Sequence, residues 1–182
     1  MHCLKMTTSA QRITSGANSK PQTCKHEYVN GKVFAMAGAS RRHNHAVGNL
    51  FARLHQQVRG TPCQVYGSDM KLHIKRQGDV RFYYPDLHIC CEDEPETYYN
   101  TRPVLIAEVP SESTGRIDRG EKLEAYKNIP SLACILLIHT SVQHVELYAR
   151  EAHWEGWVYS SSETLPLPCI NLNLPISDIY AD

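Results

Sequence analysis

Three charged residues occur along the chain in the order carboxylate, carboxylate, ammonium. Asp86 follows a proline in the run "RFYYPDLHICC", Glu108 lies near the end of the apolar run "RPVLIAEV", and Lys122 lies in the segment after it. An ionised carboxylate within a buried strand needs a partner. Carboxylates on neighbouring strands form an oxygen-rich pocket for Mg²⁺ or Mn²⁺. A lysine beside them could stabilise charge on a phosphoryl group or orient an attacking water.

Each of these residues also has a structural interpretation. Pro-Asp is common in turns, so Asp86 could be structural. Glu108 could pair with a nearby arginine. Asp118 fits a helix N-cap with a reciprocal bond from Glu121, which we favour for it. Lys122 follows Asp118 by four residues and could form only a surface ion pair. The residue types alone therefore suggest a metal site without establishing one.

The elements that would position these residues follow from local sequence signals. Asn30-Gly31 between two β-prone runs predicts a hairpin with a type I′ turn. Ser40 is a plausible N-cap for a helix that ends near Arg59, before Gly60 and Pro62. The stripe that this helix buries is expected to consist of Val47, Leu50, Phe51, Leu54 and Val58.

The sequence of the second half of the chain predicts a βαβ unit. It consists of a strand over Val104–Val109, a helix from about Asp118 to Asn128, and a strand over Leu132–His139, with the two strands parallel. We expect "RFYYPDLHICC" to be a single strand, with its proline at an edge or a bulge. The strand "MKLHIK" precedes it, and "VQHVELYAR" and "HWEGWVYS" follow the βαβ unit. The Pro-spaced tail can cover the core.

Composition limits the classes of protein that this chain could be. Its 182 residues suggest one domain over residues 26–182 after a loosely held arm, residues 1–25. The formal net charge of zero excludes a module held to nucleic acid by bulk positive charge. No apolar run approaches the roughly 18 residues of a membrane helix, and the first residues lack a signal-peptide core. No phosphate-binding loop or nucleophile elbow is present.

The seven cysteines are odd in number and include no CxxC pair. We therefore expect reduced thiols in a cytoplasmic protein, most of them small core residues. The spacing disfavours a zinc site.

Several motifs in register resemble the Uma family, which is classed with the PD-(D/E)XK, or restriction-endonuclease-like, superfamily. The stretches that carry the resemblance are "HEYVNGKVFAMAGASRRHNHAVGNL", "VYGSDMKLHI", "YYPDLHICC" and "RPVLIAEVPSESTGRIDRGEKLEAYKNIPSL". The resemblance covers about residues 26–180. It implies an α/β (α+β) fold with a restriction-endonuclease-like core, a mixed sheet flanked by helices after an N-terminal hairpin. It also implies a Mg²⁺-dependent nuclease site acting on nucleic acid, most plausibly DNA, and a homodimer.

Carried over by position, the resemblance makes Asp86 and Glu108 the motif carboxylates that bind metal. The backbone carbonyl of Val109 could add a ligand. The lysine function of the superfamily matches Lys122 on the next helix. Glu27 matches a family glutamate and could be an additional acid, although a surface position beside the hairpin explains it equally well.

One departure from the family pattern bears on activity. The family usually reads Glu-Val-Leu-Ser-Pro-Ser-Thr where this chain has Glu108-Val109-Pro110-Ser111-Glu112-Ser113-Thr114. Pro110 removes a backbone donor, and Glu112 adds a charge near the predicted site. The alternative to a nuclease is therefore a catalytically degenerate nucleic-acid-binding or protein-interaction domain of the same fold.

The start of the first predicted helix is a weaker signal. Arg41, Arg42 and His43 could contact phosphates. The helix dipole disfavours positive charge at a helix N-terminus, so another reason is needed for these residues to be there. A solvated helix start explains the same residues, and His43 could instead be a core histidine.

Overall fold

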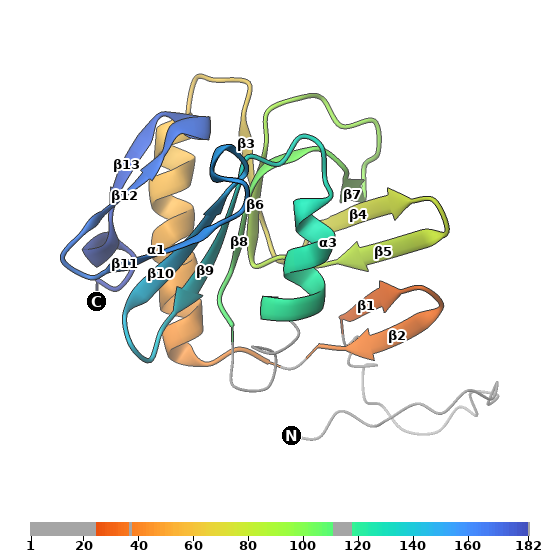
Figure 1. The fold of residues 1–182 in the computed structure, drawn as a ribbon, viewed down its shortest axis with the longest axis horizontal. Coiled ribbons are helices and arrows are strands. Elements are labelled where there is room, and N and C mark those ends of the chain that lie inside the picture. The colour runs from red at the N-terminus through yellow and green to blue at the C-terminus, as the bar shows by residue number, and fades with distance from the viewer. Residues whose placement is uncertain (1–24, 37, 111–117, 182) are drawn as a thin grey trace, which may run out of the picture.

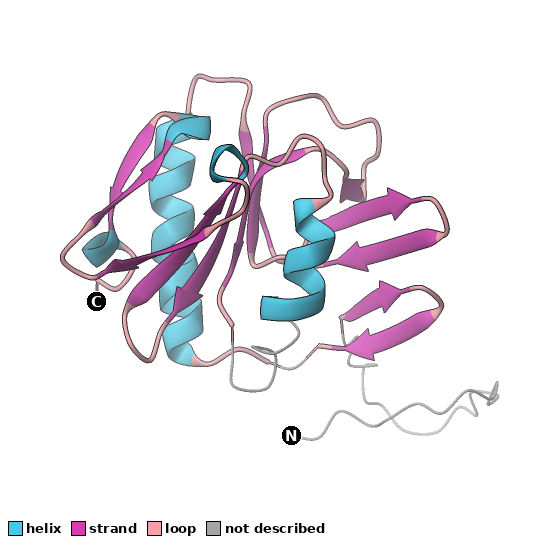
Figure 2. Cartoon of the chain, viewed as in Figure 1, coloured by secondary structure: helices cyan, strands magenta, loops and turns pink. Residues whose placement is uncertain are grey.

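The computed structural model describes residues 25–36, 38–110 and 118–181. Within these residues two helices, α1 and α3, accompany three β-sheets (Figures 1 and 2). The helical elements are α1 (Arg41–Val58), α3 (Leu123–Lys127), the π-helical turn η1 (Asp118–Lys122) and the 3₁₀ turns η2 (Arg150–Ala152), η3 (Pro168–Ile170) and η4 (Ile176–Asp178). The strands are β1 (His26–Val29), β2 (Lys32–Ala35), β3 (Gln64–Gly67), β4 (Lys71–Arg76), β5 (Asp79–Tyr83), β6 (Leu87–Cys90), β7 (Tyr99–Asn100), β8 (Pro103–Glu108), β9 (Cys134–His139), β10 (His144–Ala149), β11 (Gly156–Ser160), β12 (Thr164–Leu167) and β13 (Leu172–Pro175).

The largest sheet has the strand order β11-β10-β9-β8-β6-β3, and a five-stranded sheet has the order β2-β1-β5-β4-β7. A small third sheet pairs β12 with β13. This mixed α+β arrangement agrees with the predicted fold class. In Figure 1 the five-stranded sheet lies to the right of the larger one, beside α3.

The predicted hairpin is confirmed. β1 and β2 pair antiparallel, and Asn30 and Gly31 have φ values of 45° and 86°, the left-handed conformation that a type I′ turn requires at both positions. β1 also pairs antiparallel with β5, so the hairpin becomes the edge of the five-stranded sheet. This pairing brings the N-terminal hairpin beside residues more than fifty positions later in the chain.

The long helix begins and ends as predicted. The Ser40 side chain accepts a hydrogen bond from the backbone N–H of His43 at 3.1 Å, which satisfies an otherwise free donor of the first turn of α1. Gly60, with φ of 78°, follows the end of the helix, where a left-handed residue is common. Leu50 and Leu54 are fully buried in the stripe that faces the sheet.

The predicted βαβ unit is also confirmed. β8 and β9 pair in parallel, and the chain between them contains η1 and α3. Successive residues of β9 belong to different cores: Leu136 packs with the residues of α1, whereas Ile135 and Leu137 pack with those of α3. Because side chains of a strand alternate between faces, α1 and α3 cover opposite faces of the large sheet.

The prediction of a single strand over "RFYYPDLHICC" is wrong. The run is divided into β5 and β6, and these two strands belong to different sheets. Pro85 lies between them, and a proline has no N–H with which to continue a β-ladder. The division places Asp86 where the chain crosses from the five-stranded sheet to the large one.

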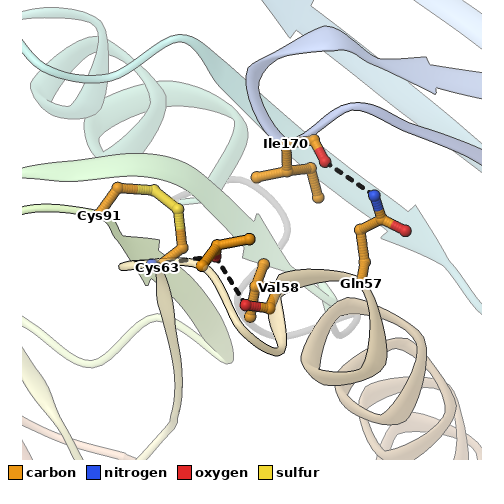
Figure 3. The surroundings of a disulfide bond; sticks show 6 residues. Gln57, Val58, Cys63, Cys91 and Ile170 are labelled. Carbon is orange, nitrogen blue, oxygen red and sulfur yellow. Dashed lines mark hydrogen bonds between the residues drawn. A yellow bond between two sulfur atoms is a disulfide. The ribbon is translucent and has the colours of Figure 1, made fainter.

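The prediction of reduced thiols is wrong for Cys63 and Cys91, which form a disulfide (Figure 3). β3 pairs antiparallel with β6 so that Gln64 lies opposite Cys90, and the next residues outward are these two cysteines. The pairing of the strands creates this contact, and cysteine spacing does not reveal it. Cys90 and Cys134 are buried free thiols, as expected for core residues.

The C-terminal segment covers the core as predicted. Leu174 and Ile176 are fully buried in the cluster that includes α1. The side chain of Asn49 on α1 donates to the backbone carbonyls of Ile179 and Ala181, which holds the end of the chain against that helix. None of the helices in the described ranges is long and apolar enough to span a membrane.

Candidate functional site

The two predicted carboxylates lie across from each other at one end of a strand pair. β6 and β8 are antiparallel, and Leu87 pairs with Ala107. The next residue outward on each strand is Asp86 and Glu108 respectively. The sequence separates them by 22 positions, and the strand pairing brings them to the same edge of the sheet.

Asp86 is fixed through one of its two carboxylate oxygens. Its Oδ2 atom accepts a hydrogen bond from the backbone N–H of Val109 at 2.8 Å and lies 3.1 Å from Nε2 of His43. The Asp86 side chain is 17% exposed. Its other oxygen, Oδ1, forms no hydrogen bond with any residue in the described ranges. One oxygen therefore orients the carboxylate while the other can face a ligand.

Glu108 lies deeper and contacts two residues of the following helical segment. The Tyr126 hydroxyl donates to Oε1 of Glu108 at 2.6 Å, and Nζ of Lys122 lies 3.5 Å from the same oxygen. The side chains of Lys122 and Glu108 are only 7% and 5% exposed. Lys122 and Tyr126 are one helical turn apart, so both reach the carboxylate from the same face.

Glu27 joins this group from the other sheet. Its Oε1 atom lies 2.8 Å from Nζ of Lys122 and accepts a hydrogen bond from the backbone N–H of Tyr84 at 3.3 Å. The lysine ammonium also lies 5.5 Å from the centre of the Tyr83 ring, within the range of a cation–π contact. The cluster is thus built at the junction of the two larger sheets and α3.

The charges of this cluster suit a divalent cation. Glu27 and Glu108 place two carboxylates against the ammonium of Lys122, and Asp86 adds a third at the end of the neighbouring strand. These four side chains together carry two negative charges. The carboxylate oxygens are hard ligands of the kind that Mg²⁺ and Mn²⁺ prefer. The donor set and the charge therefore fit such an ion.

Val109 and Pro110 are compatible with the predicted carbonyl ligand. A residue before proline favours an extended conformation. An extended residue directs its N–H and C=O toward the same neighbouring strand. Because the N–H of Val109 contacts Asp86, its carbonyl is expected to point toward the same side. The second departure from the family pattern, Glu112, lies outside the described residues.

A network outside the cluster fixes the start of the helical segment. Oε1 of Glu121 lies 3.1 Å from Arg81 and accepts a hydrogen bond from the Tyr83 hydroxyl at 3.3 Å. Burial raises the pKa of Tyr83 to about 12, so its hydroxyl keeps its proton at neutral pH and can donate. The reciprocal cap predicted between Asp118 and Glu121 depends on the side chain of Asp118, which the structure does not describe.

The structure brings together Asp86, Glu108, Lys122 and Glu27 among the residues singled out in the sequence. His43 contacts Asp86 through its ring and is 18% exposed, and its predicted phosphate contact stays a prediction. Arg41 and Arg42 are exposed on the first turn of α1, and the described contacts of the carboxylates do not include them.

The contacts of His43 with Asp86 and of Tyr126 with Glu108 were not predicted from the sequence. The spacing of Tyr126 four residues after Lys122 was an available signal for the second contact. No local signal was available for the first, because it depends on how α1 crosses the sheet.

The chain is similar to known proteins over most of its length. Residues 12–177 match the family described as "Uma2: Putative restriction endonuclease". Uncharacterized protein slr1290 of Synechocystis sp. is 31% identical over 160 residues, which cover 86% of this chain and 83% of that protein. Uncharacterized protein sll1609 of the same organism is 32% identical over 151 residues, covering 80% and 82%.

A solved structure shares the fold. It is described as a "putative nuclease belonging to DUF820" from Anabaena variabilis, and it aligns with a TM-score of 0.72 over 86% of this chain and 89% of that chain. The sequences are 16% identical in this alignment, so the likeness concerns the fold alone.

Proposed function

This chain belongs to the Uma2 family, and from that premise we propose that it is a divalent-metal-dependent endonuclease. The observation that carries the proposal is the convergence of Asp86, Glu108 and Lys122 at one edge of the large sheet. Asp86 lies in the bend before β6, Glu108 on β8 and Lys122 on η1, and in the sequence the only signal for the three was their order. Two carboxylates with a buried lysine beside them suit hydrolysis of a phosphodiester bond.

In the proposed reaction Asp86 and Glu108 hold Mg²⁺ or Mn²⁺, with the Val109 carbonyl as a further ligand. The bound ion supplies Lewis-acid polarisation of a phosphoryl oxygen and lowers the pKa of a bound water. Lys122 stabilises negative charge on the phosphoryl group or orients the attacking water. The carboxylates of Glu27 and Glu108 contact its ammonium at 2.8 Å and 3.5 Å and limit its motion.

Three further residues position these groups. His43 and the Val109 N–H hold Oδ2 of Asp86, so the other oxygen, Oδ1, keeps one orientation. Tyr126 orients Glu108 by a short hydrogen bond. Glu27 acts as an additional acid that holds Lys122 in place.

The proposed substrate is nucleic acid, with DNA as the first candidate, and the proposed assembly is a homodimer in the cytoplasm. Support for the substrate comes from the family description and from the phosphodiester chemistry of the site. The net charge of zero predicts that binding depends on local patches, such as Arg41 and Arg42, rather than on bulk attraction. Sedimentation of the purified protein tests the homodimer.

The test is cleavage of single- and double-stranded DNA with Mg²⁺ or Mn²⁺ by the wild type, Asp86→Asn and Lys122→Ala. Asp93→Asn is the matched control, because Asp93 is exposed on the link between β6 and β7. We expect cleavage by the wild type and the control, and loss of about a hundredfold or more in both site variants. Equal cleavage by all four proteins would mean that the activity does not belong to this site.

The alternative is a catalytically degenerate domain that binds nucleic acid or another protein. Its motivation is Pro110, which departs from the family pattern beside Glu108. A wild type that neither cleaves DNA nor gains stability with Mn²⁺ would favour this alternative, because an ion that binds the folded state must stabilise it.

A further inference from the structure

A second cluster of metal-ligating side chains lies on the β9–β10 hairpin. His139 ends β9, His144 begins β10, and these two residues are directly paired across the hairpin. Glu146 lies two residues further along β10, on the same face. The three ligand-type atoms of this group all lie within 4.8 Å of one another. No residue of this cluster takes part in the proposed nuclease site.

The separations within the cluster are close to those of a coordinated ion. Nε2 of His139 lies 2.8 Å from Oε1 of Glu146, and the rings of His139 and His144 have their centres 4.5 Å apart. Bond lengths near 2.1 Å in a tetrahedral zinc site correspond to ligand atoms about 3.4 Å apart. Small side-chain rotations therefore suffice to place all three ligand atoms around one ion.

Neighbouring hydroxyl groups hold the cluster in this arrangement. The Tyr148 hydroxyl donates to Oε2 of Glu146 at 2.6 Å, which fixes the carboxylate from the side away from His139. The Tyr180 hydroxyl lies 3.1 Å from the carbonyl oxygen of His139 and 2.8 Å from that of His144. The C-terminal segment thus braces the backbone of both histidines. Such supporting contacts to ligands are typical of metal sites.

We propose that His139, His144 and Glu146 bind a divalent transition-metal ion, with Zn²⁺ as the ion that the ligand types favour. Imidazole nitrogen suits zinc far better than magnesium, which prefers oxygen ligands alone. Two histidines and a glutamate leave the fourth tetrahedral position to water. The side chains of His139 and Glu146 are 12% and 13% exposed, so an ion can enter from solvent.

The proposed zinc site is separate from the carboxylates of the nuclease site but lies on the same sheet face. Leu137 of β9 pairs with Glu108 on one side and with Glu146 on the other. Two strand spacings therefore separate the glutamates, or about 10 Å. This exceeds the separation of about 4 Å in two-metal catalytic centres. The zinc would act on the stability of the hairpin beside the nuclease site.

A simple ion pair between His139 and Glu146 is the competing explanation. It accounts for the 2.8 Å contact but gives no part to His144, whose ring packs against the same histidine. A shared metal ion instead uses a ring nitrogen of each histidine as a ligand.

The test is the binding of Zn²⁺ and of Co²⁺, its spectroscopic substitute, to the metal-free full chain. Zn²⁺ is expected to raise the melting temperature in a saturable manner, and Co²⁺ to give the visible absorption of a tetrahedral site. His144→Ala and Glu146→Gln should each weaken binding about tenfold or more. His55→Ala is the matched control, because His55 is an exposed histidine on α1.

Asp86→Asn removes a ligand of the nuclease site only, so it should keep the Co²⁺ absorption of the tetrahedral site and thereby separates the two sites. Equal affinity of His144→Ala, Glu146→Gln and the wild type would overturn the proposal. Absence of any effect of Zn²⁺ on the wild type would do the same. Far-UV circular dichroism of each variant shows whether weaker binding reflects lost ligands or an unfolded chain.

Discussion

Replacing Lys122 with methionine should reveal how strongly the buried carboxylates depend on its charge. Methionine fills a similar volume but carries no ammonium. The change leaves Glu27 and Glu108, whose side chains are 12% and 5% exposed, without the positive charge between them. Buried carboxylates that lose their partner are strongly destabilising, because the desolvation of their charge is no longer offset.

The two distances give the scale of the effect. At an effective dielectric constant of 20, the 2.8 Å and 3.5 Å separations correspond to attractions of about 6 and 5 kcal/mol before desolvation. Removal of one partner of a buried pair costs about 3–5 kcal/mol in practice. We therefore expect Lys122→Met to lose about 3–5 kcal/mol of unfolding free energy, a large part of a typical domain's stability.

Urea denaturation followed by circular dichroism measures this loss, with Lys127→Met as the matched control. Lys127 lies on the same helix and forms a more exposed i,i+3 pair with Glu124 at 2.8 Å, so its loss should cost less than about 1 kcal/mol. In a double-mutant cycle, Glu27→Gln should restore about 1–3 kcal/mol to Lys122→Met. A Lys122→Met variant within about 1 kcal/mol of the wild type, or strict additivity with Glu27→Gln, would refute this account.

Three further changes test separate parts of the structure. Tyr126→Phe removes the hydroxyl that donates to Glu108, so the free energy of unfolding in urea should fall by about 2 kcal/mol and nuclease turnover should also fall. Unchanged values of both would show that the hydroxyl is dispensable. Burial lowers the pKa of His88 from its ordinary value of 6.5 to about 4. As pH drops from 6.5 to 4, the unfolded chain therefore takes up a proton that the folded chain does not, and the free energy of unfolding should fall by about 3 kcal/mol. His88→Gln should flatten that part of the pH–stability profile, and an identical profile would contradict the assignment. The disulfide of Cys63 and Cys91, 28 residues apart, should contribute about 3.5 kcal/mol to the free energy of unfolding. Dithiothreitol should therefore lower the melting temperature of the wild type and leave that of Cys63→Ser/Cys91→Ser unchanged. Equal sensitivity of the two proteins to dithiothreitol would be inconsistent with this bond.

The elements that local sequence determines were predictable. The Asn30-Gly31 turn, the Ser40 cap and the helical stripe of α1 depend on residues a few positions apart, and all agree with the structure. The parallel pairing of β8 and β9 followed from the helix between them and the short connections. Because the parallel strands and the helix between them were predicted as one unit, the approach of Glu108 to Lys122 could be anticipated.

The features that were not predicted all depend on contacts between distant segments. β5 pairs with β1, about fifty residues earlier, and this pairing draws β5 out of the large sheet and away from β6. The Cys63–Cys91 bond requires the pairing of β3 with β6. The contact of His43 with Asp86 requires α1 to cross the end of that strand. None of these has a signal within a single segment.

The most direct test of the central claim is the position of Mn²⁺ in a crystal of the full chain, measured by anomalous scattering. The account predicts a peak within about 2.5 Å of carboxylate oxygens from both Asp86 and Glu108, and its disappearance in Asp86→Asn. A Mn²⁺ peak elsewhere, with none between these two carboxylates at a saturating concentration, would contradict it.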